Sequence, residues 1–181
     1  ALGERLKREY GLTINGSVAM ADLIYSQQGR LALETLWRSY MEIAEKYNLP
    51  FLATTPTRRA NKQQVIQAGY DEAIIEDNVR FLRKIKETSN IEMYIGGLMG
   101  CKGDAYTGTG ALNIEEAHDF HHWQAQLFKL AKADFLYAGI MPVLAEAMGM
   151  ARAMSDTGIP YIISFTIQKD GKLIDGHTID L

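Results

Sequence analysis

Hydrophobic residues follow two patterns along this chain. The first places apolar residues three and four positions apart, as on one face of an amphipathic helix. This spacing predicts helices over residues 30–47, 71–87, 114–132 and 142–154. The second pattern is a short run that is apolar throughout, which is typical of strands buried on both faces. Such runs predict strands over residues 50–55, 91–98, 134–140 and 160–167. Because the two kinds of segment alternate, the chain is expected to be an α/β protein with a parallel sheet.

Local helix signals agree with these bounds. Pro50 closes the first helix and opens the strand that follows it. Asn113 and Glu116 have the spacing of a capping pair at the start of the third helix. Pro142 suits the first turn of the last helix, which should end before Gly158.

Composition narrows the class of protein. The chain has 181 residues, of which 47% are hydrophobic and 23% charged, with a net charge of −3, so it fits a single globular domain. The charges are spread without long runs of one sign, which argues against nucleic acid and membrane surfaces as partners. Cys101 is the one cysteine, so an internal disulfide and a four-thiolate zinc site are both impossible, and a reducing cytoplasmic location is expected.

A glycine-rich loop follows the predicted strand at residues 91–98. Residues 96–110 hold six of the chain's sixteen glycines. The loop lacks the Gly-Lys-Ser/Thr ending of a phosphate-binding loop and the third glycine of a dinucleotide fingerprint. A shaped loop at the mouth of a substrate pocket is therefore favoured over phosphate binding.

Three histidines occur in the predicted helix at residues 114–132. His118 and His122 lie one turn apart and could share a metal ion. His121 falls instead on the apolar face with Phe128, so the three rings do not converge. A position in the middle of a helix is also far from the strand ends where α/β sites form. Surface and packing roles are therefore favoured over metal binding.

Two further candidates follow strands. Cys101 could be a nucleophile, but no histidine is near it in sequence. Arg58 and Arg59 follow the first predicted strand and could contact an anionic substrate group, although a solvated helix start is favoured.

Several segments together resemble the homocysteine S-methyltransferase family. They occur in the family's order and spacing, and they are Gly96–Gly100, Asp104–Gly108, Asn113–His121, Ala131–Leu136, Pro142–Ala147 and Pro160–Thr166, with Asp170-Gly171 and Asp175-Gly176. The resemblance implies a (β/α)₈ TIM barrel, of which residues 1–181 would be one domain with about five of the eight βα units, incomplete at both ends.

The resemblance also implies an activity. A methyltransferase of this family transfers a methyl group from a sulfonium, betaine or folate donor to a thiol such as homocysteine, in methionine biosynthesis. The expected partners are thus a small-molecule methyl donor and a thiol acceptor, with homo-oligomer formation also considered. Zinc held by three cysteine thiolates would activate the acceptor sulfur, because zinc deprotonates a bound thiol at neutral pH.

The chain departs from the family pattern in two respects. The zinc cysteines of the family lie at later strand ends, so no metal ligand is expected among these residues, and no catalytic residue is assigned. Gly139 stands where the family has a glutamate. An alternative is a divergent or non-catalytic partial barrel that serves as an interaction subunit or binds another small molecule. The residues expected to line the pocket are Thr54, Thr55, Thr57, Gly97, Tyr106 and Thr166.

Overall fold

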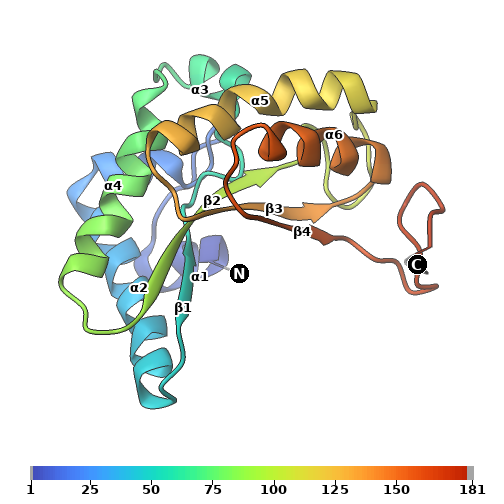
Figure 1. The fold of residues 1–181 in the computed structure, drawn as a ribbon. Coiled ribbons are helices and arrows are strands. Elements are labelled where there is room, and N and C mark those ends of the chain that lie inside the picture. The colour runs from blue at the N-terminus through green and yellow to red at the C-terminus, as the bar shows by residue number, and fades with distance from the viewer. Residues whose placement is uncertain (1, 179–181) are drawn as a thin grey trace.

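The computed structural model describes residues 2–178 of the chain. Its helices are α1 (Leu2–Tyr10), the 3₁₀ helix η1 (Ala21–Tyr25), α2 (Gln27–Lys46), α3 (Lys62–Gln67), α4 (Ala73–Glu87), α5 (Ile114–Leu130) and α6 (Leu144–Ser155) (Figure 1). Its strands are β1 (Phe51–Thr54), β2 (Met93–Gly100), β3 (Phe135–Met141) and β4 (Tyr161–Phe165).

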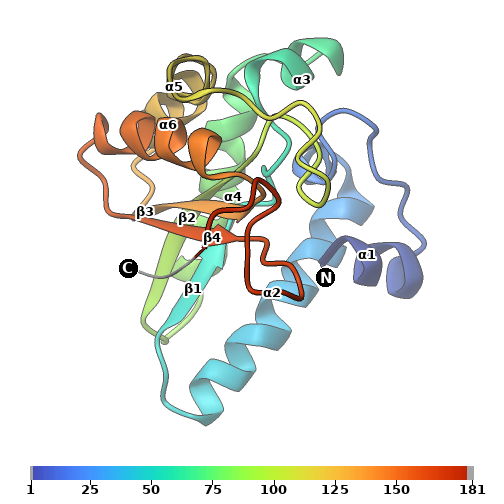
Figure 2. The same ribbon diagram turned by 90° about the vertical axis from the view of Figure 1, so that its right-hand side faces the viewer.

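The strands form one parallel sheet in the order β1-β2-β3-β4. All of them end at the same edge, which we call the strand-end edge. In Figure 2 the ends of β3 and β4 point towards the viewer, and the long loop between β2 and α5 lies on this side of the sheet. Sites in α/β folds form at this edge, because the loops that follow parallel strands gather there.

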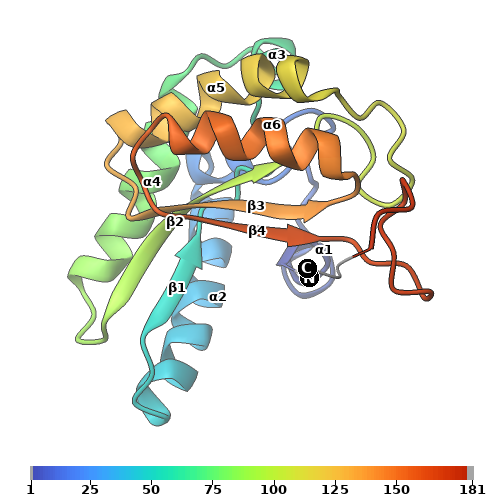
Figure 3. The same ribbon diagram turned by 45° about the vertical axis from the view of Figure 1, so that its right-hand side comes forward.

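One face of the sheet is covered by helices. Ala53, Ile95 and Leu136 point to this side and are almost completely buried. Helices α5 and α6 lie side by side along β3 and β4 (Figure 3). Their close approach depends on Gly149, because a Cβ atom at this position would overlap the carbonyl oxygen of Ile114.

The opposite face of the sheet is open. Leu52, Tyr94 and Ile162 point to this side and remain 53%, 41% and 45% exposed. In a closed barrel, side chains on this face fill the interior. The described residues therefore form a curved half-barrel with an apolar inner face.

The class and the order of elements are as the sequence predicts, and Asn113 and Glu116 make the expected capping box. Three short helices, α1, η1 and α3, were not predicted. The described residues hold four strands, which are preceded by α1, η1 and α2, where about five βα units were expected from the resemblance. No helix among the described residues is both long and apolar enough to cross a membrane.

Candidate functional site

The loop between β2 and α5 is fastened to α6 by a buried carboxylate. Glu146 is fully buried, and its Oε1 accepts a hydrogen bond from the amide of Lys102 at 2.7 Å. Its Oε2 accepts a longer bond, of 3.4 Å, from the amide of Leu112. The ring of His121, also buried, lies with Nε2 3.1 Å from Oε1. One side chain thus holds both ends of the loop, which makes the loop a shaped part of the strand-end edge.

A cavity lies between this loop and the loop that follows β1. Its volume is about 330 Å³, near the lower end for small-molecule pockets. Arg58 lies across the end of β2, where a Cβ atom on Gly100 would be 2.6 Å from the Arg58 Cγ. The Arg58 Nε is covered and has no hydrogen-bond partner among the described residues. Arg59 and Lys102 also lie in its wall, against the single carboxylate of Asp104, so the cavity favours an anionic group.

Cys101 lies in the same wall, but its thiol is not activated. Burial, with a further contribution from the negative charge of Glu146, raises the pKa of Cys101 to about 11. The thiol donates a weak hydrogen bond to the Gly103 carbonyl, at 3.4 Å. Since the thiolate is the reactive form, this environment makes Cys101 a poor nucleophile, contrary to the role considered from the sequence.

The end of β3 carries backbone strain. Ile140 has a φ of 52°, a left-handed conformation that is unfavourable for a β-branched residue. The register between β3 and β4 shifts at this point. The Ser164 hydroxyl accepts a hydrogen bond from the Ile140 amide at 2.9 Å, which holds the bulge. Bulges of this kind redirect side chains at the rims of barrels and beside active sites.

Two of the predicted pocket residues serve the sheet instead. Thr55 and Thr57 are fully buried, and their hydroxyl oxygens are 2.7 Å apart. The amide of Leu98 donates to Thr55 Oγ1, and Thr57 Oγ1 donates to the Leu98 carbonyl. These bonds continue the pairing of β1 with β2 beyond the end of β1. The expectation that Thr55 and Thr57 line a pocket is therefore wrong.

Gly97 does not line the expected pocket either, because it faces the helices. A Cβ atom at Gly97 would lie 2.5 Å from the ring of Phe128 in α5. Tyr106 does border the cavity and is 68% exposed. Thr54 is half-buried at the end of β1 on the inner side of the sheet. Thr166 follows β4, and its hydroxyl is covered without a hydrogen-bond partner among the described residues. The structure thus brings Tyr106 to the cavity and leaves Thr54 and Thr166 at other strand ends.

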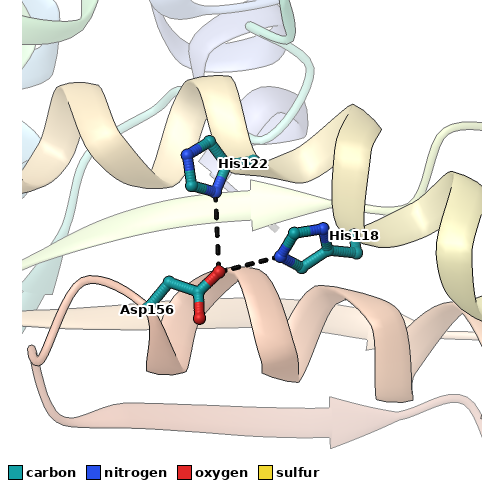
Figure 4. A group of neighbouring side chains, drawn as sticks. All are labelled: His118, His122 and Asp156. Atoms are coloured by element: carbon teal, nitrogen blue, oxygen red, sulfur yellow. Dashed lines mark hydrogen bonds and ion pairs between the residues drawn. The ribbon is translucent and has the colours of Figure 1, made fainter.

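The histidines separate as the helical spacing predicts, with His121 buried and the other two on the flank of α5. Asp156 of the neighbouring helix joins His118 and His122 (Figure 4). Hydrogen bonds to Asp156 and then Asp119 raise the pKa of His118 above its ordinary value. Asp156 was not among the candidates, because nothing local in the sequence links it to α5.

A family model described as homocysteine S-methyltransferase matches residues 1–181. The chain belongs to this family. The match covers every strand and every loop of the strand-end edge, so the resemblance seen in the sequence is confirmed. A search of curated proteins gave no match.

Solved structures of a homocysteine methyltransferase share the fold. The metallated form of MmuM from Escherichia coli superimposes with a TM-score of 0.79 at 20% identity, covering 99% of this chain and 65% of that one. The oxidized form gives a TM-score of 0.81 at 20% identity, covering 99% and 64%. This homocysteine S-methyltransferase family member thus spans about two thirds of the length of MmuM, with a partial TIM-barrel fold.

The residues of this family member do not fit a zinc site made of three thiolates. Cys101 is the one cysteine in the chain. Its thiol is buried and donates a hydrogen bond to the Gly103 carbonyl, and one cysteine cannot supply three thiolates. No step of a reaction is therefore assigned to a thiolate-bound zinc ion in this chain.

Proposed function

We propose that this chain forms part of a homocysteine S-methyltransferase, which transfers a methyl group from a small-molecule donor to a thiol such as homocysteine. The observation that carries the proposal is the family match over residues 1–181. The reaction would serve methionine biosynthesis, and the low cysteine content favours the cytoplasm as its location.

Arg58 is the proposed contact for the carboxylate of the amino-acid acceptor. Arg58 lines the cavity and makes no side-chain ion pair among the described residues, so its guanidinium can pair with a carboxylate there. Arginine forms paired, charge-assisted hydrogen bonds with carboxylates, which fix the orientation of the bound group. Tyr106 borders the same cavity, and we keep Thr54 and Thr166 as proposed contacts at the neighbouring strand ends.

The test is methionine formation from homocysteine by the longest product of the reading frame that encodes these residues. Sulfonium, betaine and folate donors are offered in turn. Loss of the Arg58 contacts should reduce affinity by roughly 1.5–3 kcal/mol, so R58M is expected to raise KM for homocysteine about 10- to 150-fold with a smaller change in kcat. R152M, at an exposed position of α6 outside the lining of this cavity, is the matched control. If none of these donors supports methionine formation and the protein does not bind homocysteine, the proposal is contradicted.

The alternative function is that of an interaction subunit without catalysis. The open inner face supports it, since Leu52, Tyr94 and Ile162 are exposed there. Gly139 also lies on this face, with Leu98 3.1 Å from the position of a Cβ atom, so a glutamate would fit only if Leu98 moved slightly. If G139E tightens homocysteine binding, a diverged substrate pocket is supported. If neither the unmodified protein nor G139E binds homocysteine, the role of an interaction subunit is favoured.

A further inference from the structure

His118, His122 and Asp156 bring three metal-binding atoms together on the helical side of the sheet. The ligand atoms of the three residues all lie within 4.8 Å of one another. Asp156 Oδ2 is 2.8 Å from His118 Nε2 and 3.7 Å from His122 Nδ1 (Figure 4). The close approach of α5 and α6 at Gly149 brings the two helices into this contact.

This cluster is separate from the strand-end edge. Helix α6 begins where β3 ends and runs back towards the start of β4, and Asp156 is its C-cap residue. Asp156 therefore lies towards the opposite edge of the sheet from the cavity beside Arg58. A function of the cluster would be independent of the proposed methyl transfer.

Both ring nitrogens of His118 face carboxylates. Nδ1 lies 3.2 Å from Asp119 Oδ1, and Nε2 faces Asp156. A neutral imidazole has one N–H, and a carboxylate only accepts, so a cation or a second proton must lie between one nitrogen and its partner. A metal-binding histidine ordinarily donates its other N–H to a carboxylate, which is the part Asp119 can play here.

Two more observations favour a cation. The Nδ1 atom of His122 is covered by protein and has no hydrogen-bond partner among the described residues. Asp156 stands at the C-terminus of α6, where the helix dipole stabilises positive charge.

We propose that His118, His122 and Asp156 form a binding site for a divalent transition-metal ion of the zinc type, which clamps α5 to α6. Two imidazoles and one carboxylate are a common zinc ligand set, with bonds of about 2.0–2.2 Å. A tetrahedral ion with such bonds needs ligands about 3.3 Å apart, and the observed separations from Asp156 fall on either side of that value. The side chains are 30%, 44% and 48% exposed, which leaves the fourth position to water.

The test titrates the metal-free chain with Zn²⁺ in competition with a chromogenic chelator. One saturable ion per chain is expected, whatever the assembly state. H118A, H122A and D156N should each weaken binding at least tenfold, and D119N should weaken it by a smaller factor without abolishing it. H177A, which removes another exposed histidine paired with an aspartate, and C101S should leave the affinity unchanged.

A second measurement needs no substitution. Co²⁺ bound at the site should give visible absorption bands of nitrogen and oxygen ligands, without a thiolate charge-transfer band in the ultraviolet. A thiolate band, a loss of binding in C101S, equal binding by the chain in concentrated urea, or an unchanged affinity in the H118A/H122A double variant would each overturn the proposal.

Discussion

Glu146 is expected to control the opening of the loop between β2 and α5. The substitution E146A removes the acceptor for the Lys102 and Leu112 amides and leaves the buried ring of His121 without its partner. A hydrogen bond to a charged group contributes roughly 1.5–3 kcal/mol, and 1.4 kcal/mol changes an equilibrium tenfold. Loss of the Lys102 bond alone should therefore raise the open population of the loop about 10- to 150-fold.

Limited trypsin digestion measures this opening directly. The bond after Lys102 is cleaved only when the loop leaves its hydrogen-bonded conformation, so the cleavage rate follows the open population. The exposed Lys169, in the segment after β4, provides an internal reference. Mass spectrometry of the fragment 1–102 over time should show cleavage in E146A accelerated by the factor above relative to cleavage at Lys169.

Two substitutions sharpen the result. E146Q keeps an acceptor of the same shape and loses the charge, so an acceleration of about fivefold is expected, between that of E146A and the unmodified chain. E115A removes an exposed glutamate of α5 that pairs with Arg152, and should have no effect at Lys102. An acceleration below about threefold in E146A, or an equal acceleration at Lys169, would refute the role of Glu146 as a fastener of the loop.

Three more predictions concern Cys101 and the two faces of the sheet. Because the pKa of Cys101 is about 11, its thiolate fraction at pH 8 should be about one in a thousand, and iodoacetamide labelling should accelerate as pH rises towards 11; rapid labelling at pH 7.5 would contradict this. G97A should lower the free energy of unfolding by about 1–3 kcal/mol through overlap with Phe128, measured from urea midpoints, whereas G16A, with no atom within 4 Å, should not. The exposed inner face should make the chain self-associate, and L52K should shift sedimentation towards the monomer.

The order of elements could be predicted from sequence because apolar spacing is a local property. The run from Phe135 to Met141 is apolar in whatever sheet it joins, and Asn113 with Glu116 caps α5 from within one turn. Helix α3 was missed because six residues are too few to show a helical period. Its start is marked only by the Asn61 side chain, which accepts a hydrogen bond from the Gln64 amide.

The pocket residues could not be predicted in the same way. Thr55 and Thr57 follow a strand, which is where α/β sites form, but their hydroxyls are taken up by Leu98, more than forty residues later. A residue that follows a strand can be placed near the strand-end edge from sequence. Whether its side chain lines a pocket or bonds to the neighbouring strand depends on the register of that strand, which the sequence does not show. The burial of Glu146 carried no signal in the sequence either, since an acidic residue in the first turn of a helix is ordinarily placed there by the helix dipole.

The flank of α5 shows how a helical wheel can be read further in an α/β fold. The wheel places His121 towards the sheet and His118 and His122 to one side, and both placements agree with the structure. In this fold the side of one helix packs against the next helix, because successive βα units lie next to one another. Polar residues on a flank are therefore the ones positioned to meet the following helix, and the residue to look for is an acceptor such as Asp156 near its end. Two of the proposed ligands, His118 and His122, are recognised by their spacing on one helix. The third, Asp156, is recognised only because the fold places α6 beside α5.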